Sequence, residues 1–402
     1  MPSKVLIVKL LLYSHYFAPS IGGVETSVES LAAGLAEVRS PEINKKFEVT
    51  LVTQSAMGAF DDGALSFPVV RRPPLTKLWT LIRDSDIVHI AGPSLAPLFL
   101  AFVARKPFVV EHHGYQAICP NGLLNYLPDR TMCPGHFQAH QYWKCFLCRN
   151  CELSAFQSIS SLLLMFPRLW LVRRAAKNVA ITRHVLERHK LPRSEVVYYG
   201  IEDPLLKRNP GRSTSNPGDT ISFAFVGRFA PEKGIPILLQ AACQLAKEGH
   251  TFTVRLIGDG PERAVLEGLI RRDHLENHVS ITGYLRGRKL TEALSDVRVV
   301  VMPSIWEETA GLAAIEQMMR GKLVIASNTG GLGEVLDEAG LRCPAGDADA
   351  LADCMRAVLR DPSLIESLGR KARERALLLF RRPRMLEQHV GVYRQLLREM
   401  RT

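Results

Sequence analysis

Two carboxylates eight residues apart mark the segment of this sequence that is most suggestive of chemistry. Glu308 and Glu316 flank a run of small and apolar residues in the stretch SIWEETAGLAAIE. On a single helix, eight residues would separate the two side chains by about 12 Å and about 80°, which suits neither an ion pair nor a shared metal. Either the two are unrelated surface charges, or the first lies on a loop and both face one elongated ligand.

The residues between the carboxylates favour the second arrangement. A proline and a serine end the apolar run before this stretch, and the next helix is expected to begin near Ala310. Glu308 would then lie on the loop and Glu316 in the helix, with the free N–H groups of Gly311 and Leu312 between them. Acceptors for hydroxyls on either side of donors for phosphate match the order of sugar, diphosphate and ribose in a nucleotide sugar. A helix capped by surface acids is the alternative.

Two cations follow another apolar, strand-like run. The stretch FVGRFAPEKG places Arg228 directly after a glycine and Lys233 five residues later. A guanidinium fork and an ammonium at the carboxyl end of a strand are suited to binding a diphosphate. A solvated charged loop remains the alternative.

Gly22 and Gly23 lie between the first expected strand and the first expected helix, in SHYFAPSIGGVETS. Glycines there allow the backbone to approach a phosphate at a helix N-terminus. The pair is not a G-x-G-x-x-G motif, so a plain tight turn is an equally good interpretation, and a nicotinamide-dependent dehydrogenase is disfavoured.

Five of the eight cysteines fall within residues 119–151, and the last three form the pattern C-x2-C-x2-C. This spacing is typical of thiolate metal sites and suggests a structural zinc ion that stabilises the insertion. Reduced thiols without a metal, disulfides and an iron–sulfur cluster are the alternatives. The candidate ligands are Cys119, Cys133, Cys145, Cys148 and Cys151.

The order of apolar runs predicts two doubly wound α/β domains, each with a parallel sheet, that face each other across a cleft. Residues 1–203 form the first domain, which would carry the Cys-rich insertion at 119–151. Residues 204–219, rich in Pro, Gly, Ser and Asn, form the expected linker. Residues 220–380 form the second domain, and residues 381–402 contain a helix that would pack back on the first. The apolar positions expected to pack in that helix are Met385, Val392, Leu396 and Met400.

Charge and hydropathy narrow the class of partner. The formal net charge of the 402 residues is +11, and the excess is local: residues 168–212 carry 11 Lys and Arg against 4 Asp and Glu. No nucleic-acid-binding signature accompanies the basic residues, so an anionic membrane surface or substrate is expected. The apolar run at 160–174 should be too short to span a bilayer and forms either a buried helix or an interfacial helix. Because the N-terminus is strand-like rather than a signal peptide, we expect a cytoplasmic protein at the inner face of the membrane.

Taken together, these motifs resemble those of the family 4 retaining glycosyltransferases, which have the GT-B fold. The resemblance extends over nearly the whole chain and is most specific in the second domain. The matching stretches are APSIGGVE, EHHGYQAICP, VGRFAPEKG, LIGDGPE, VSITGYL, the two glutamates of E-x7-E and IASNTGGLGEVL.

The resemblance implies roles for individual residues. Arg228 and Lys233 would bind the diphosphate, Glu308 the sugar hydroxyls and Glu316 the ribose. Backbone groups would make the other contacts to the donor. Those that would contact phosphate belong to Gly22, Gly23, Gly311 and Leu312. Those that would line the base belong to Gly283, Tyr284 and Leu285. His113 would be the active-site histidine, with His112 as the competing assignment. The sequence departs from the family pattern at Ala310, which bears on donor-sugar preference, and at Tyr199, which bears on the base pocket.

The resemblance also implies a reaction. A hexose-type sugar would pass from a UDP- or GDP-sugar to a hydroxyl of a glycan or lipid-linked acceptor, with retained anomeric configuration and no cofactor for catalysis. The product would be an envelope polysaccharide or a glycolipid. A GT-B epimerase, a phosphorylase and a non-catalytic nucleotide-sugar or membrane-docking module are the other hypotheses. Arg228, Lys233, Glu308 and Glu316 occurring together argue against the last of these.

Overall fold

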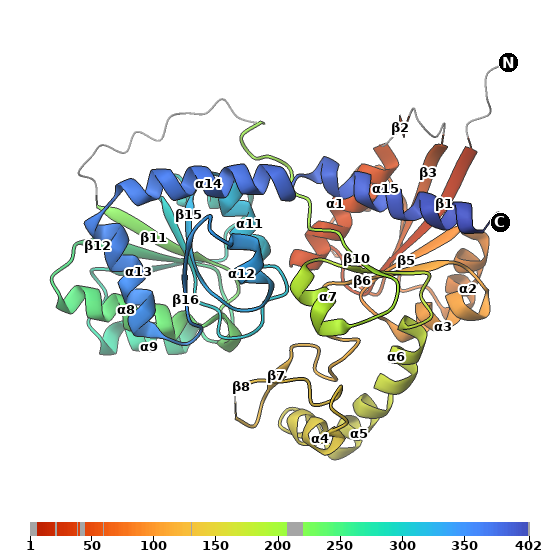
Figure 1. The fold of residues 1–402 in the computed structure, drawn as a ribbon, viewed down its shortest axis with the longest axis horizontal. Coiled ribbons are helices and arrows are strands. Elements are labelled where there is room, and N and C mark those ends of the chain that lie inside the picture. The colour runs from red at the N-terminus through yellow and green to blue at the C-terminus, as the bar shows by residue number, and fades with distance from the viewer. Residues whose placement is uncertain are drawn as a thin grey trace. The chain divides into compact units, whose positions relative to one another are not determined.

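The computed structural model describes residues 6–20, 22–37, 39–40, 45–58, 60–129, 131–206 and 220–400. The chain divides into two compact units (Figure 1). Unit 1 comprises Met1–Ile201 and Arg381–Thr402, and unit 2 comprises Glu202–Phe380. Of the linker expected at 204–219, residues 207–219 lie outside the described residues.

Unit 1 is built on one predominantly parallel sheet with the strand order β10-β9-β6-β5-β1-β3-β2 and with β4 paired to β3. Among these pairs, only β2 with β3 is antiparallel. The strands are β1 (Leu6–Ser14), β2 (Arg39–Ser40), β3 (Lys45–Thr53), β4 (Val69–Arg71), β5 (Ile87–Ala91), β6 (Phe108–His112), β9 (Lys177–Ala180) and β10 (Ser194–Val196). The helices are α1 (Gly23–Glu37), α2 (Leu75–Asp84), α3 (Leu95–Val103), α4 (Tyr142–Asn150), α5 (Ala155–Leu163), α6 (Met165–Val172), α7 (Arg183–His189) and α15 (Arg382–Glu399), with a 3₁₀ turn at Asp62–Ala64.

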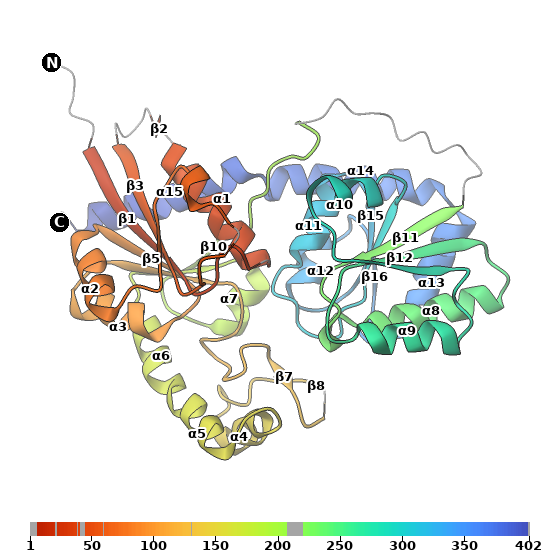
Figure 2. The same ribbon diagram turned by 180° about the vertical axis from the view of Figure 1, so that it is seen from behind.

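The central strands of unit 1 are apolar because helices cover them. Every residue of β5 and β6 is buried, which is typical of parallel sheets covered on both faces. Helices α1 and α15 lie side by side over the sheet (Figures 1 and 2). Their contact is close, since a Cβ atom on Gly34 of α1 would come within 2.5 Å of the Leu386 side chain of α15.

Helix α15 packs on unit 1 through Met385, Val392 and Leu396, which all belong to its core. The fourth position expected on that face, Met400, is 56% exposed. That expectation was wrong because α15 ends at Glu399, and Met400 lies at its C-terminal cap, where the helix no longer faces the core.

The segment from β7 (Asn125–Tyr126) to α6 projects from the sheet of unit 1 (Figure 1). It contains the apolar run for which the sequence left open a buried or an interfacial helix. Helices α5 and α6 expose Phe156, Leu163 and Trp170 but bury Met165, Leu171 and Val172, so they form an amphipathic stretch with one exposed face and not a fully buried helix. The apolar run was expected to be too short to span a bilayer. The helical stretch Ala155–Val172 is nevertheless long and apolar enough to cross a membrane, judged by length and composition only, and 22% of it is buried.

Unit 2 has a parallel six-stranded sheet with the order β13-β12-β11-β14-β15-β16. The strands are β11 (Ile221–Val226), β12 (Phe252–Ile257), β13 (Val279–Gly283), β14 (Val299–Met302), β15 (Leu323–Ser327) and β16 (Leu341–Cys343). The helical elements are the 3₁₀ turn η2 (Pro231–Lys233), α8 (Ile235–Lys247), α9 (Arg263–Arg272), α10 (Gly287–Ala293), α11 (Leu312–Met319), α12 (Gly330–Leu336), α13 (Ala348–Arg360) and α14 (Ser363–Leu379).

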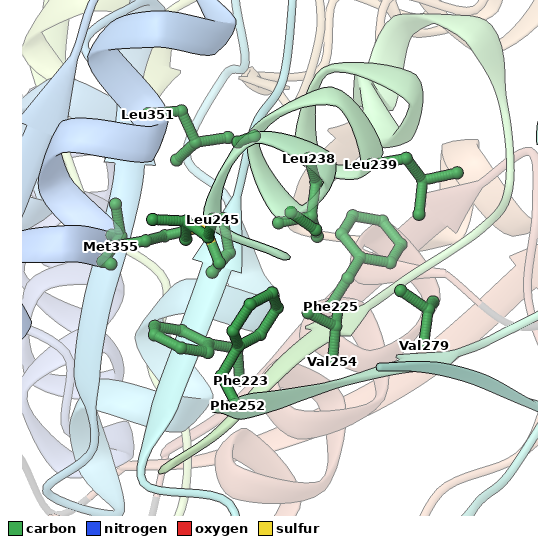
Figure 3. Close-up of a cluster of buried hydrophobic side chains, with 14 of the residues drawn as sticks. Phe223, Phe225, Leu238, Leu239, Leu245, Phe252, Val254, Val279, Leu351 and Met355 are labelled. Atoms are coloured by element: carbon green, nitrogen blue, oxygen red, sulfur yellow. The ribbon is translucent and has the colours of Figure 1, made fainter. Parts of the chain in front are cut away.

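Aromatic side chains fill the core of unit 2. Phe223 and Phe225 of β11 and Phe252 of β12 point toward Leu238 and Leu245 of α8 (Figure 3). All five are at most 2% exposed. Each fully buried Phe or Leu contributes about 1.5–3 kcal/mol relative to an exposed one, so this core fixes the sheet whose strand ends carry the candidate site.

Candidate active site

The candidate donor-binding residues of unit 2 lie where the order of its strands reverses. β11 is the first strand of this sheet in the chain, with β12 on one side and β14 on the other. Arg228 and Lys233 follow the carboxyl end of β11, and Glu308 follows that of β14. In open α/β sheets, this switch point is where ligands bind. The fold thus brings together Lys233 and Glu308, which lie 75 residues apart in sequence.

Lys233 and Glu308 form a close ion pair. The Lys233 Nζ atom lies 2.5 Å from Glu308 Oε1, and the Ser304 hydroxyl donates to the same oxygen at 2.9 Å. The Glu308 side chain is buried. Burial by itself would raise the pKa of Glu308, but the charge and hydrogen bond of Lys233 outweigh it and lower that pKa. Glu308 is therefore a charged acceptor held in a fixed orientation at neutral pH.

Two glycines hold the backbone around Glu308. Gly331 donates its N–H to the Glu308 carbonyl at 2.6 Å. Gly330 has φ of 57°, and a Cβ atom there would lie 2.3 Å from the same carbonyl. Only glycine fits both this conformation and this close approach. Both glycines belong to the motif IASNTGGLGEVL, whose sequence alone did not predict this role for them.

Helix α11 begins at Leu312 with Gly311 as its N-cap at φ of 74°. Glu308 therefore lies on the preceding loop and Glu316 in the second turn of the helix. Glu316 is half-buried, and burial raises its pKa, with Arg320 partly offsetting that effect. Ala310 is buried.

The remaining residues of unit 2 expected at the donor site are more exposed. The Arg228 side chain is 68% exposed and pairs with Glu232 at 2.8 Å. At the end of β13, Gly283 has φ of 77°, Leu285 is half-buried and Tyr284 is 51% exposed. These side chains leave the backbone after β13 accessible to a ligand.

In unit 1, His113 lies directly after β6 and contacts two polar side chains. Its Nδ1 is 2.8 Å from the Tyr199 hydroxyl, and the two rings stack. Its Nε2 is 3.5 Å from Glu111 Oε2. Tyr199, the departure that was expected to affect the base pocket, is therefore the partner of the candidate active-site histidine.

His112 lies in a different environment. Its Nε2 is 3.0 Å from Asn178 Oδ1, and its ring centroid is 4.6 Å from that of His189 in α7. Burial, with the nearby His189, lowers the pKa of His112 to about 3. His112 therefore packs inside the unit as a neutral group, whereas His113 has a carboxylate partner.

The buried Glu111 carboxylate connects His113 to helix α15. It lies 3.0 Å from His89 Nε2 and 3.7 Å from His389 Nε2, and the Tyr393 hydroxyl is 2.8 Å from His89 Nδ1. Burial would raise the pKa of Glu111, but the surrounding histidines hold it well below its usual range. This network could not be predicted from the sequence, because its members lie up to 304 residues apart.

Gly22 and Gly23 lie at the start of α1, directly after the loop that follows β1. Gly22 has no side chain to cover its backbone. A Cβ atom added there would come within 2.5 Å of the Glu25 carboxylate. Of the five cysteines expected to bind metal, Cys119, Cys133, Cys145 and Cys148 are buried and Cys151 is exposed.

Unit 2 gathers groups whose chemistry suits an anion and, beside it, the hydroxyls of a sugar. Cationic groups follow β11, a buried carboxylate follows β14, and the first residue of α11 comes four residues after that carboxylate. The cations and amides can stabilise phosphate charge, and the carboxylate can accept hydrogen bonds from sugar hydroxyls.

Comparison with known proteins gives a family match that covers most of unit 2. Residues 209–375 match the family described as glycosyl transferases group 1. The 2-deoxystreptamine glucosyltransferase of Streptomyces kanamyceticus is 35% identical over 152 residues, 37% of this chain and 39% of the relative. The N-acetyl-alpha-D-glucosaminyl L-malate synthase of Bacillus anthracis is 28% identical over 207 residues, 51% of this chain and 52% of the relative. The chain thus matches about half or less of the length of these curated relatives.

Solved structures share the fold over nearly the whole chain. Anabaena Alr3699/HepE in complex with UDP and glucose has a TM-score of 0.72 at 18% identity, with 96% of this chain and 100% of that chain covered. Sucrose-phosphate synthase of Thermosynechococcus elongatus has a TM-score of 0.70 at 21% identity, with 98% and 100% covered. The predicted GT-B class of two Rossmann-like α/β domains is confirmed. Residues 209–375, which fall within unit 2, thus match the family described as glycosyl transferases group 1, and the chain as a whole shares the GT-B fold.

Proposed function

We propose that this protein is a glycosyltransferase that moves a hexose-type sugar from a UDP- or GDP-sugar to an acceptor hydroxyl. The observation that carries the proposal is the Lys233–Glu308 pair at the switch point of unit 2. Relatives named for transfer of glucose or N-acetylglucosamine units support it, as do neighbours of the same fold that bind UDP and UDP-glucose.

The proposed mechanism assigns the residues by charge. Breaking the sugar–diphosphate bond places negative charge on the leaving phosphate, and Arg228, Lys233 and the α11 amides would stabilise it. Glu308 would hold the sugar hydroxyls and keep Lys233 in position, and Glu316 would bind the ribose. The anomeric configuration would be retained, with the leaving phosphate helping to deprotonate the acceptor. Catalysis would need no cofactor beyond these groups.

The decisive experiment is a donor screen that measures UDP or GDP release by the wild type and by Glu308→Gln. We expect release from one nucleotide sugar in the presence of acceptor, and a loss of about 100-fold in Glu308→Gln because the sugar is no longer positioned. Glu307→Gln makes the same chemical change one residue earlier and should retain activity. The proposal fails if no nucleotide sugar is bound or turned over.

The same screen separates the alternatives. A non-catalytic nucleotide-sugar module would bind a donor tightly without releasing nucleotide in any acceptor mixture. An epimerase would change the configuration of the sugar without acceptor, and a phosphorylase would require inorganic phosphate. The buried Lys233–Glu308 pair favours the transferase, because a binding module has no need for a cation placed against the leaving group.

On the acceptor side, the proposal includes a glycan or lipid-linked acceptor reached at the inner face of the membrane. Exposed apolar side chains recur at spacings of three and four along the nearly continuous helices α5 and α6, at Phe156, Ile159, Leu163, Phe166 and Trp170. This spacing places them on one stripe of the helices. We call it the α5–α6 stripe.

Aromatic and basic side chains extend this stripe. The Phe102 ring of α3 meets the Trp170 ring edge to face at 5.1 Å, and the Arg174 guanidinium lies 3.5 Å from the Trp170 ring centroid. Arg173 beside it is exposed. An apolar stripe with a basic trailing edge suits the surface of an anionic bilayer, which supports a cytoplasmic, peripheral location.

Vesicle co-sedimentation tests this partner. The full chain should bind vesicles that contain phosphatidylglycerol more strongly than vesicles of phosphatidylcholine alone, and added salt should weaken the binding. The double variant Phe156→Ser/Leu163→Ser should bind several-fold less. Met57→Ser is the control, because Met57 is also an exposed apolar residue of unit 1, at 75%. Equal binding to both vesicle types, or no effect of the double variant, would exclude an anionic membrane surface that is contacted through the α5–α6 stripe.

A further inference from the structure

Four buried thiols in unit 1 line one small cavity. Cys119, Cys133, Cys145 and Cys148 are each at most 7% exposed. Together with His136 they surround a space of about 10 Å³, which is close to the volume of a single water-sized sphere. Four of the ten residues that line this space are cysteines, and a space of this size suits one metal ion.

The four thiols lie on two adjacent elements, a short antiparallel strand pair with its flanks and the helix α4. Cys119 precedes the antiparallel pair of β7 and β8 (Thr131–Met132), and Cys133 follows that pair directly. Cys145 and Cys148 lie on α4 at positions i and i+3, where two side chains share one face of a helix. Two ligands from a short hairpin and two from a helix are an arrangement that four-thiolate zinc sites can adopt, and zinc–sulfur bonds of about 2.3 Å would draw the sulfurs inward.

Groups around the cavity are suited to stabilising thiolates. The His136 backbone N–H donates to Cys133 Sγ at 3.5 Å, and the Asn121 side-chain amide donates to Cys148 Sγ at 3.4 Å. Arg149 also lines the cavity, and its Nε is buried without a hydrogen-bond partner in the described structure. Donors to the ligand atoms and a nearby cation stabilise a site of net negative charge, such as Zn²⁺ with four thiolates.

Two other sets of potential ligands fit less well. Cys151 is exposed and donates to the Leu147 carbonyl at 3.5 Å, and it does not line the cavity. The ligand atoms of His89, Glu111 and His389 lie within 4.8 Å of one another. Both histidines, however, already use Nδ1 in hydrogen bonds, and Glu111 is the shared partner of the histidine network, so a metal there would have to break it.

We propose that Cys119, Cys133, Cys145 and Cys148 bind one structural zinc ion. The ion would fix the segment that follows His113 by linking the β7–β8 pair to α4. The site uses none of the residues assigned to the nucleotide sugar, so it stands or falls independently of the proposed function.

The test is the metal content of the full chain, measured by mass spectrometry of the elements after gel filtration in reducing, metal-free buffer. We expect about one zinc per chain. Cys145→Ser and Cys148→Ser should each lower this content at least about tenfold, whereas Cys151→Ser, the same change three residues later, should retain it. His136→Gln should also retain zinc, and its loss in that variant would overturn the four-sulfur set.

Two measurements on the wild type keep the proposal testable if the serine variants fail to fold. Peptide mapping should show the four cysteines protected from alkylation until a chelator is added, with Cys151 labelled from the start. Substitution with Co²⁺ should give the absorption of a tetrahedral thiolate site. The proposal is overturned by zinc at the level of the buffer blank, by disulfides among the four cysteines, or by bound iron. No sugar donor enters these measurements, so they are separate from failure of the transferase proposal.

Discussion

At the residue scale, the candidate donor site depends on close contacts that a single substitution can break. Lys233 and Glu308 are paired at 2.5 Å, and the loop that carries Glu308 is held by the backbone of Gly330 and Gly331. A charged pair of this kind positions its members only if the loop cannot shift. The glycines are therefore as important for the position of Glu308 as its ion pair.

Gly330→Ala tests this dependence. The new Cβ would lie 2.3 Å from the Glu308 carbonyl and would displace the loop, so we expect a loss of nucleotide release of about 10-fold or more with the fold retained. Gly346→Ala is the matched control: its φ is 79°, similarly left-handed, but nothing lies within 4 Å of its Cβ. Both variants should lose about 1–2 kcal/mol of stability from backbone strain. Equal activity of the two in the donor assay would show that the Glu308 loop tolerates the shift.

At the element scale, the sequence predicted the strands and helices that carry the donor residues. The apolar run that was expected to end at Pro303 is β14, which ends at Met302, and the helix that was expected to begin near Ala310 is α11, which begins at Leu312. The spacing of the apolar residues was sufficient to predict these elements, because a proline or a glycine marks the end of each apolar run. The histidine network could not be predicted, because it joins β5, β6 and α15 through contacts between distant residues.

The interpretation of the apolar run at 160–174 shows a second limit. Its composition fits a buried helix and an interfacial one equally well, and only packing distinguishes them. Within this run the structure leaves Leu163 and Trp170 exposed at 60% and 45% but buries Met165 and Leu171. Likewise, cysteine spacing identified a metal-binding pattern, but the spacing alone gave no reason to separate Cys151 from its neighbours.

The packing of α7 on β6 makes unit 1 sensitive to acid. Burial lowers the pKa of His112 to about 3 and that of His189 to about 4, whereas the unfolded chain has ordinary values near 6.5. Below pH 6.5 the unfolded state therefore binds more protons, so the stabilisation is complete above pH 6.5 and is lost as the pH falls toward 4.

Urea unfolding followed by circular dichroism between pH 7 and pH 5 measures this loss. Each histidine should contribute a slope approaching about 1.4 kcal/mol per pH unit at the acid end of this range. His189→Gln should reduce the slope by about one proton, and His274→Gln, an exposed position in unit 2, should not. A wild-type stability that is constant over this range would contradict the assignment of two neutral buried histidines.

At the scale of the whole molecule, the chain leaves unit 1 after Ile201 and returns to it at Arg381. Unit 2 is thus continuous in sequence, whereas unit 1 is completed only by the last segment of the chain. Helix α15 supplies Met385, Val390 and Tyr393 to the core of unit 1, and Tyr393 also bonds to His89. Unit 1 should therefore depend on residues synthesised after all of unit 2.

Met385→Ala tests whether this dependence is confined to unit 1. Met385 is 2% exposed, and its truncation should cost about 2–5 kcal/mol, whereas Met400→Ala at the exposed end of the chain segment should cost less than about 0.5 kcal/mol. Hydrogen exchange should then show lost protection in β1, β5 and α1 but unchanged protection in β11 and β14, because these strands belong to a separate core. Equal loss of protection in both sets of strands would mean that the two units unfold as one cooperative structure. The two cores would then not be independent units of stability.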